Sequence, residues 1–73
     1  MPHVIVKLYS GRTEEQKAKL AEEVCNAVIS ALACDEKSVS VAIQDIRPAD
    51  WQDKVYKPDI LANSARIYKK PAY

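Results

Sequence analysis

The chain has 73 residues, with eleven Lys and Arg against ten Asp and Glu and a formal net charge of +1. This length predicts a single domain, residues 1–73, whose core is too small to be strongly stabilising by itself. The balanced charge argues against nucleic acid as a partner. No apolar run is long enough to cross a membrane and no basic leader precedes one, so we expect a cytoplasmic protein without a membrane partner.

The cysteine and histidine content excludes two common ways of stabilising a small fold. Cys25 and Cys34 lie in or near one predicted helix, which separates them by roughly 13 Å, whereas a disulfide needs Cα atoms within about 7 Å. His3 is the only histidine and there is no CxxC pair, so we expect neither a metal site nor a cofactor. Self-association is the remaining way to supplement the core.

The first predicted element is a strand over His3–Tyr9. Val4, Val6 and Leu8 fall on one face of this strand, and the other face is mixed. Gly11, the only glycine, follows at a predicted turn, where it can adopt a backbone conformation that other residues find strained.

A long amphipathic helix is predicted next, from Thr13 to near Ala33. Thr13 and Gln16 have the spacing of a capping box, and the acidic residues between them complement the helix dipole. Apolar residues then recur at three- and four-residue intervals, as expected for one buried helix face. They are Leu20, Val24, Ala27, Val28, Ala31 and Leu32.

Alternating apolar residues predict a second strand over residues 38–46. Two strands joined by one long crossover helix form a β-α-β unit, an α/β fold whose strands are parallel. The helix covers one face of such a sheet and leaves the other bare, so we expect oligomerisation to complete the sheet.

The last third of the chain has weaker patterns. Ala49–Asp53 is predicted to form a short helical turn, and Pro58 to interrupt the chain after that turn. We expect a short C-terminal helix over Ile60–Tyr68 and an extended tail at Pro71–Tyr73.

Pro2 is the most distinctive candidate residue. If Met1 is removed, Pro2 carries a free secondary amine at the start of the first strand. An α-amino group has a pKa of about 8, well below that of lysine, and an apolar surrounding favours its neutral, proton-accepting form. The structural alternative is that a proline at the first position of a strand costs no ladder hydrogen bond.

Several stretches together resemble the 4-oxalocrotonate tautomerase family, and within it the PptA-type branch. The resemblance covers residues 1 to about 51 and extends for that branch to the tail, Lys69-Lys70-Pro71-Ala72-Tyr73. The stretches that carry it are Met1-Pro2-His3, Gly11-Arg12-Thr13-Glu14-Glu15-Gln16-Lys17, Ser38-Val39-Ser40-Val41 and Trp51.

The resemblance implies a keto-enol tautomerase, an isomerase that acts on enols of 2-oxo acids such as phenylpyruvate. It assigns Pro2 as the general base, Arg12 as the residue that binds the substrate carboxylate, and Trp51 as an apolar wall of the pocket. A planar guanidinium is suited to bidentate carboxylate binding. The structural alternatives are a solvated loop arginine and a tryptophan that serves only as a core anchor.

Ser40 departs from the family pattern, because the resemblance places a second arginine at this position. A hydroxyl can donate one hydrogen bond but cannot neutralise a second carboxylate, so a monocarboxylate substrate fits better than a dicarboxylate. Lys7, Arg47 and Tyr9 are possible substitutes, and the sequence selects none of them. His3 either tunes the site or lines a subunit contact.

We expect a homodimer, with a hexamer as the alternative, because residues from about 58 to 73 can cover the surface on which shorter family members stack. Two other functions stay open. One is a non-catalytic module for assembly or partner binding, and the other is a different reaction of an amino-terminal proline, such as dehalogenation or decarboxylation.

Overall fold

The computed structural model describes residues 1–73 and contains one two-stranded sheet with helices before and after its second strand. The regular elements in chain order are β1 (His3–Tyr9), α1 (Glu14–Leu32), η1 (Glu36–Ser38), β2 (Ser40–Ile46), η2 (Pro48–Asp50), η3 (Gln52–Leu61) and η4 (Ser64–Arg66). None of these helices is both long and apolar enough to span a bilayer.

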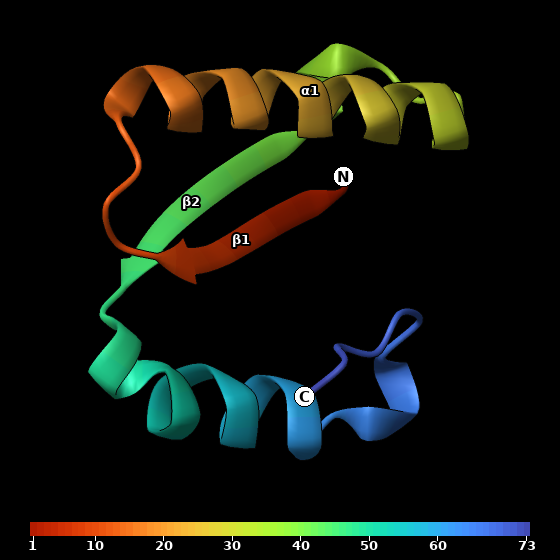
Figure 1. The fold of residues 1–73 in the computed structure, drawn as a ribbon. Helices are drawn as coiled ribbons and strands as arrows, with labels where there is room; N and C mark the ends of the chain where they lie inside the picture. The colour runs from red at the N-terminus through yellow and green to blue at the C-terminus, as the bar shows by residue number, and fades with distance from the viewer.

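The two strands are parallel, which confirms the predicted β-α-β unit. His3 lies opposite Ser40 at one end of the sheet, and Tyr9 lies opposite Ile46 at the other. The crossover helix α1 runs along one side of the sheet (Figure 1). This arrangement brings the amino-terminal ends of both strands together and the carboxyl ends together.

The start of α1 follows the predicted capping box. The Thr13 hydroxyl accepts a hydrogen bond from the Gln16 amide at 3.1 Å, and the Gln16 side chain accepts one from the Thr13 amide at 2.9 Å. Thr13 is the cap, so the helix itself begins one residue later than predicted. Gly11 has φ +120° in the preceding turn, a conformation that glycine adopts without the Cβ clash of other residues.

The predicted C-terminal helix over Ile60–Tyr68 is wrong in its position. The helix lies earlier, at Gln52–Leu61, and has wide π-type turns that include Pro58. Proline in an α-helix clashes with the carbonyl four residues earlier, so the wider turn provides a way to keep the chain helical across Pro58. A 3₁₀ turn at Ser64–Arg66 replaces the second half of the predicted helix.

Asn63 ends η3. Its side-chain amide donates to the carbonyl oxygens of Pro58 and Asp59, at 3.2 and 3.3 Å. These bonds satisfy carbonyl groups that have no partner at the end of a helix. The tail then turns back toward η3 (Figure 1).

The side of the sheet opposite α1 is not bare, contrary to the prediction, because η3 lies on that side (Figure 1). An ion pair between Lys7 on β1 and Asp59 on η3 joins the two elements. The cover is incomplete, since Ile5 on β1 remains 51% exposed.

The protomer is open. Val55 on η3 is the only one of the 73 residues that is buried. The radius of gyration is 13.6 Å, whereas a compact domain of this length has about 11 Å. Apolar residues such as Leu32 and Leu61 are more than half exposed. The shape suggests that a second copy completes the core.

Candidate active site

One group of predicted site residues gathers at the amino-terminal end of the sheet. The Pro2 carbonyl accepts a hydrogen bond from the Ser40 amide at 3.1 Å, which extends the sheet by one residue. His3 Nδ1 and Ser40 Oγ are hydrogen-bonded at 2.6 Å, with the His3 tautomer deciding which atom donates. Pro2, His3 and Ser40 therefore form one cluster, and both side chains of the hydrogen-bonded pair are exposed to solvent.

A second group gathers at the other end of β1, around Arg12. Arg12 is held between the Gly11 turn and the Thr13 cap of α1. It lines an open cavity of about 650 Å³, which we call the Arg12 cavity. The residues that line this cavity are Lys7, Leu8, Tyr9, Arg12, Trp51, Gln52 and Tyr73.

Trp51 forms an apolar wall of the Arg12 cavity. Its ring meets the ring of Tyr9 edge to face, with a centroid distance of 5.1 Å and an interplanar angle of 82°. The indole Nε1 donates a hydrogen bond to the Tyr73 hydroxyl at 3.1 Å. Trp51 is half-buried and is held by both contacts. Edge-to-face packing of two rings is favourable, and a buried tryptophan usually has a hydrogen-bond partner for its indole N–H.

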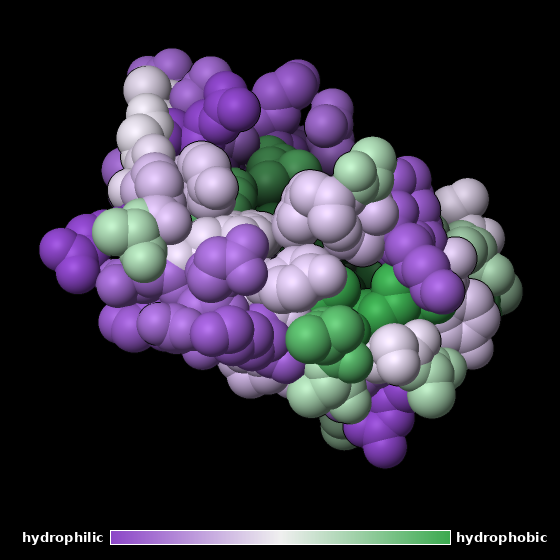
Figure 2. Space-filling model, turned by 60° about the horizontal axis from the view of Figure 1, so that its bottom comes forward, coloured by the Kyte–Doolittle hydropathy of each residue, from purple (hydrophilic) through white to green (hydrophobic).

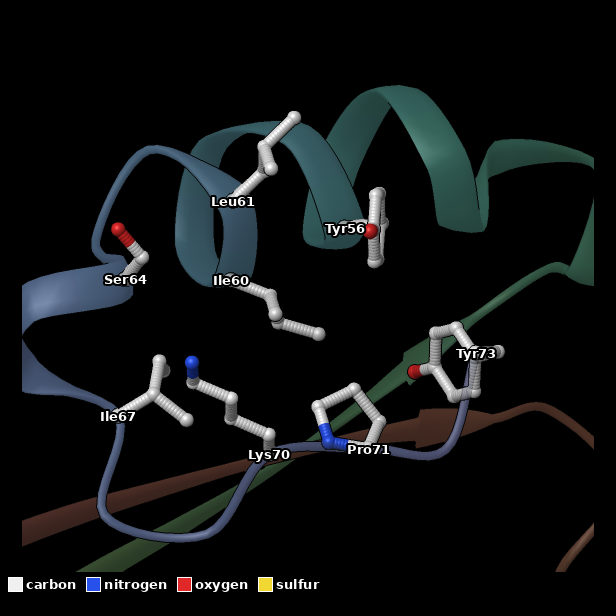
Figure 3. Close-up of a pocket in the computed structure, with 8 residues that line it drawn as sticks. All are labelled: Tyr56, Ile60, Leu61, Ser64, Ile67, Lys70, Pro71 and Tyr73. Atoms are coloured by element: carbon white, nitrogen blue, oxygen red, sulfur yellow. The ribbon is translucent and has the colours of Figure 1, made fainter.

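The tail also closes a smaller, mainly apolar cavity of about 180 Å³ beneath η3, in which Tyr73 and Pro71 face Tyr56 and Ile60 (Figure 3). The Tyr73 and Tyr56 rings are 5.7 Å apart. The view from the η3 side shows hydrophobic side chains gathered in a recess with polar residues around it (Figure 2). Tyr73 lines both cavities, so it connects the tail with the candidate site.

The basic residues near this end of the sheet differ in whether they form ion pairs with acidic residues. Asp50 accepts hydrogen bonds from Arg47 at 3.0 and 3.4 Å and lies 3.5 Å from Lys54. The Arg47 hydrogen bond holds the pKa of the Asp50 carboxyl below its ordinary value. Arg47 is thereby neutralised and does not line the Arg12 cavity, whereas Arg12 has no ion-pair partner in the structure.

Lys17 shows the same kind of pairing on α1. Its ammonium lies 2.8 Å from Glu14 and 3.0 Å from Asp45. Hydrogen bonds to Glu14 and then to Asp45 raise the pKa of Lys17 above its ordinary value. The Asp45 contact fixes the first turn of α1 to the end of β2, and Lys17 lines a cavity together with Arg12.

The two groups of residues do not meet within one protomer. Pro2 precedes β1 and Arg12 follows it, and a strand of seven residues spans about 20 Å. The structure brings Arg12 and Trp51 together, and it separately brings Pro2 and Ser40 together. One chain therefore contains two separate groups of candidate site residues, which we call half-sites.

Some residues of these half-sites could not be selected from the sequence. Lys7 and Tyr9 were two of three possible substitutes for the missing arginine, and both line the Arg12 cavity. No site role was predicted for Gln52, which lies in the predicted helical turn at Ala49–Asp53, or for Tyr73, which lies in the tail predicted only as extended. The His3–Ser40 hydrogen bond depends on the strand register, which the sequence pattern does not fix.

The fold and both half-sites define a class of β-α-β proteins, and comparison with known proteins identifies it. The family model described as tautomerase enzyme matches residues 2–55. A probable tautomerase of Xylella fastidiosa (strain 9a5c) is 40% identical over all of this chain and 89% of its own length. Tautomerase PptA of Escherichia coli O157:H7 is 34% identical, covering all of this chain and 97% of its own.

Solved structures agree with these sequence matches. YwhB, a homologue of 4-oxalocrotonate tautomerase, is 41% identical with a TM-score of 0.61, over 63% of this chain and 75% of its own. A 4-oxalocrotonate tautomerase isozyme of Methylibium petroleiphilum is 36% identical with a TM-score of 0.66, over 68% of this chain and 81% of its own.

The chain belongs to the tautomerase family, and it is an isomerase of the tautomerase type. Residues 56–73 lie outside the family model, whereas the two curated relatives align over the whole chain.

Proposed function

We propose that this enzyme interconverts the enol and keto forms of 2-oxo acids such as phenylpyruvate, with the amine of Pro2 as general base after removal of Met1. The observation that carries the proposal is the Arg12 cavity, in which an unpaired guanidinium lies beside an aromatic wall. A cation and an apolar surface are what an aryl 2-oxo acid requires of its binding site.

The reaction needs a base that is neutral at working pH. A free α-amine meets this condition more readily than a lysine, because its pKa is about 8 and not about 10.4. The Pro2 nitrogen takes the proton of the enol hydroxyl, and the resulting ammonium returns a proton to the adjacent carbon of the enol. The product is the ketone, and the amine is regenerated. With Met1 attached, the Pro2 nitrogen is part of an amide and is not basic.

Ser40 completes the polar side of the Pro2 cluster. Its hydroxyl lies beside the strand end that carries Pro2 and can donate one hydrogen bond to a substrate oxygen when His3 Nδ1 is the donor in the His3–Ser40 hydrogen bond. Since it carries no charge, the site binds one carboxylate, through Arg12. A monocarboxylate enol is the substrate class that this arrangement favours.

A complete site requires two copies of the chain. A copy related by a two-fold axis perpendicular to the strands has its strands in the opposite direction, so that Pro2 of one copy can approach the Arg12 cavity of the other. The open protomer and the exposed Ile5 on β1 support such a pairing. The homodimer is thus the assembly that we propose, with a hexamer as the alternative.

The substitution Pro2→Ala tests the role of the base. We expect phenylpyruvate tautomerisation to fall at least about a hundredfold in kcat/KM, because the positioned base is changed, while the circular dichroism spectrum stays that of the wild type. The mass of each protein must first show that Met1 has been removed. Unchanged turnover in a correctly processed variant would show that Pro2 is not the base.

A further inference from the structure

The Arg12 cavity contains two basic side chains that differ in their pairing. Arg12 has no acidic partner. Lys7 points from β1 toward η3 and forms an ion pair with Asp59. The side chains of Lys7 and Asp59 are 28% and 39% exposed, so water screens this pair less than one at the open surface. The cavity therefore offers one available cation and one that is already neutralised.

Lys7 stands at the boundary between two cavities. It lines the Arg12 cavity on one side. On the other side it lines a cavity of about 370 Å³ together with Ile5, Val55, Asp59 and Asn63. Asp59 lines only this second cavity, so it pairs with Lys7 from behind, outside the space where we place the substrate.

The position of Asp59 is fixed by η3. Val55, one helical turn before Asp59, is the single buried residue of the chain, at 4% exposure. The Asn63 amide donates to the Asp59 backbone carbonyl at 3.3 Å, which holds the end of the helix. The backbone that carries Asp59 is thus held by the packing of Val55 and by the Asn63 side chain.

We propose that Asp59 sets the charge selectivity of the enzyme, because it neutralises Lys7 and leaves Arg12 as the one cation available to a substrate. A monoanionic carboxylate is then matched by Arg12, whereas the second carboxylate of a dianion finds no free cation. This inference rests on the proposed function of the Arg12 cavity. It adds that the cavity discriminates against dicarboxylate substrates.

The substitution Asp59→Asn tests the inference, since asparagine keeps the size of the side chain and removes its charge. The probes are crotonate and fumarate, two four-carbon acids that differ in a methyl group and a second carboxylate. Their binding is measured by the emission of Trp51, the only tryptophan, which lines the cavity. We expect the affinity for fumarate relative to crotonate to rise roughly tenfold in Asp59→Asn, the gain of one charge-assisted hydrogen bond.

Two further variants separate a local effect from a general one. Asp53→Asn removes the same charge from an exposed pair with Lys57 that lines no cavity, and it should leave the fumarate-to-crotonate ratio at the wild-type value. In the double variant Lys7→Met with Asp59→Asn, the gain in fumarate affinity should disappear, because the released ammonium is absent.

The outcomes distinguish this inference from the proposed function. If the wild type tautomerises phenylpyruvate and Arg12→Ala weakens binding of crotonate, but Asp59→Asn leaves the ratio unchanged, the selectivity role is wrong and the function stands. An equal change in Asp53→Asn also overturns the selectivity role. If Trp51 emission in the wild type responds to neither acid, both proposals fail.

Discussion

The role of each basic residue near the candidate site depends on its acidic neighbours. Arg12 and Arg47 are both exposed arginines next to a helix start, and the sequence gives no reason to treat them differently. In the structure Asp50 neutralises Arg47, whereas Arg12 is unpaired and faces the cavity. We therefore expect Arg12, and not Arg47, to bind the substrate.

Asp50 leads to a prediction about pH. The pKa of Asp50 is lowered in the folded state, chiefly by the Arg47 hydrogen bond. Its contribution to stability is therefore fully present at a pH above the unfolded-state pKa of about 4, and it is lost as the pH falls through the lowered folded-state pKa. We expect Asp50→Asn to have a lower melting temperature than the wild type near neutral pH, because the ion pair with Arg47 is lost. The decrease should be small, because exposed ion pairs contribute little to stability. This difference should shrink in thermal melts below about pH 4. A difference that stayed constant into acid would contradict the assignment.

At the scale of elements, the tail is what fixes the aromatic wall of the Arg12 cavity. Pro71 and Tyr73 lie against the residues of η3, and the Tyr73 hydroxyl accepts the indole hydrogen bond of Trp51. No periodicity in the last residues indicates this return. The tail thus contributes to the lining of the Arg12 cavity, although the sequence pattern indicates only an extended end.

The substitution Tyr73→Phe tests this role of the tail. It removes the acceptor of the Trp51 hydrogen bond and keeps both rings, so we expect a shift in Trp51 emission and about a threefold rise in KM for phenylpyruvate with little change in kcat. Tyr68→Phe is the matched control, because the Tyr68 side chain is fully exposed. Equal effects of the two substitutions would remove Tyr73 from the site.

At the scale of the whole molecule, the protomer is a sheet with helices on both sides and almost no closed core. One buried residue in 73 is too little to stabilise a monomer of this length. Because Pro2 and Arg12 lie at opposite ends of β1, association has a second consequence beyond stability. We expect assembly to form the active site itself.

Subunit complementation tests this expectation. In a mixed dimer of Pro2→Ala and Arg12→Ala chains, one site combines both substitutions and the other contains both native residues. We expect co-refolding of the two inactive variants to restore about a quarter of the wild-type activity, since half of the dimers are mixed and half of their sites are intact. Sedimentation establishes the size of the assembly. If a dimer forms without any restored activity, the site is not shared between subunits.

The sequence was sufficient to predict β1, α1, β2 and the resemblance to the tautomerase family. Alternation, the capping box and the single glycine specified β1, α1 and β2, because these signals depend on neighbours a few residues apart. The position of the helix Gln52–Leu61 was missed, since Pro58 indicates an interruption in the sequence. The wide turns of this helix avoid the clash between a proline ring and the carbonyl four residues earlier. Tertiary structure alone decided the pairing of His3 with Ser40, of Lys7 with Asp59 and of Trp51 with Tyr73. Each pair joins residues that lie far apart in the chain, so no local pattern encodes their contact.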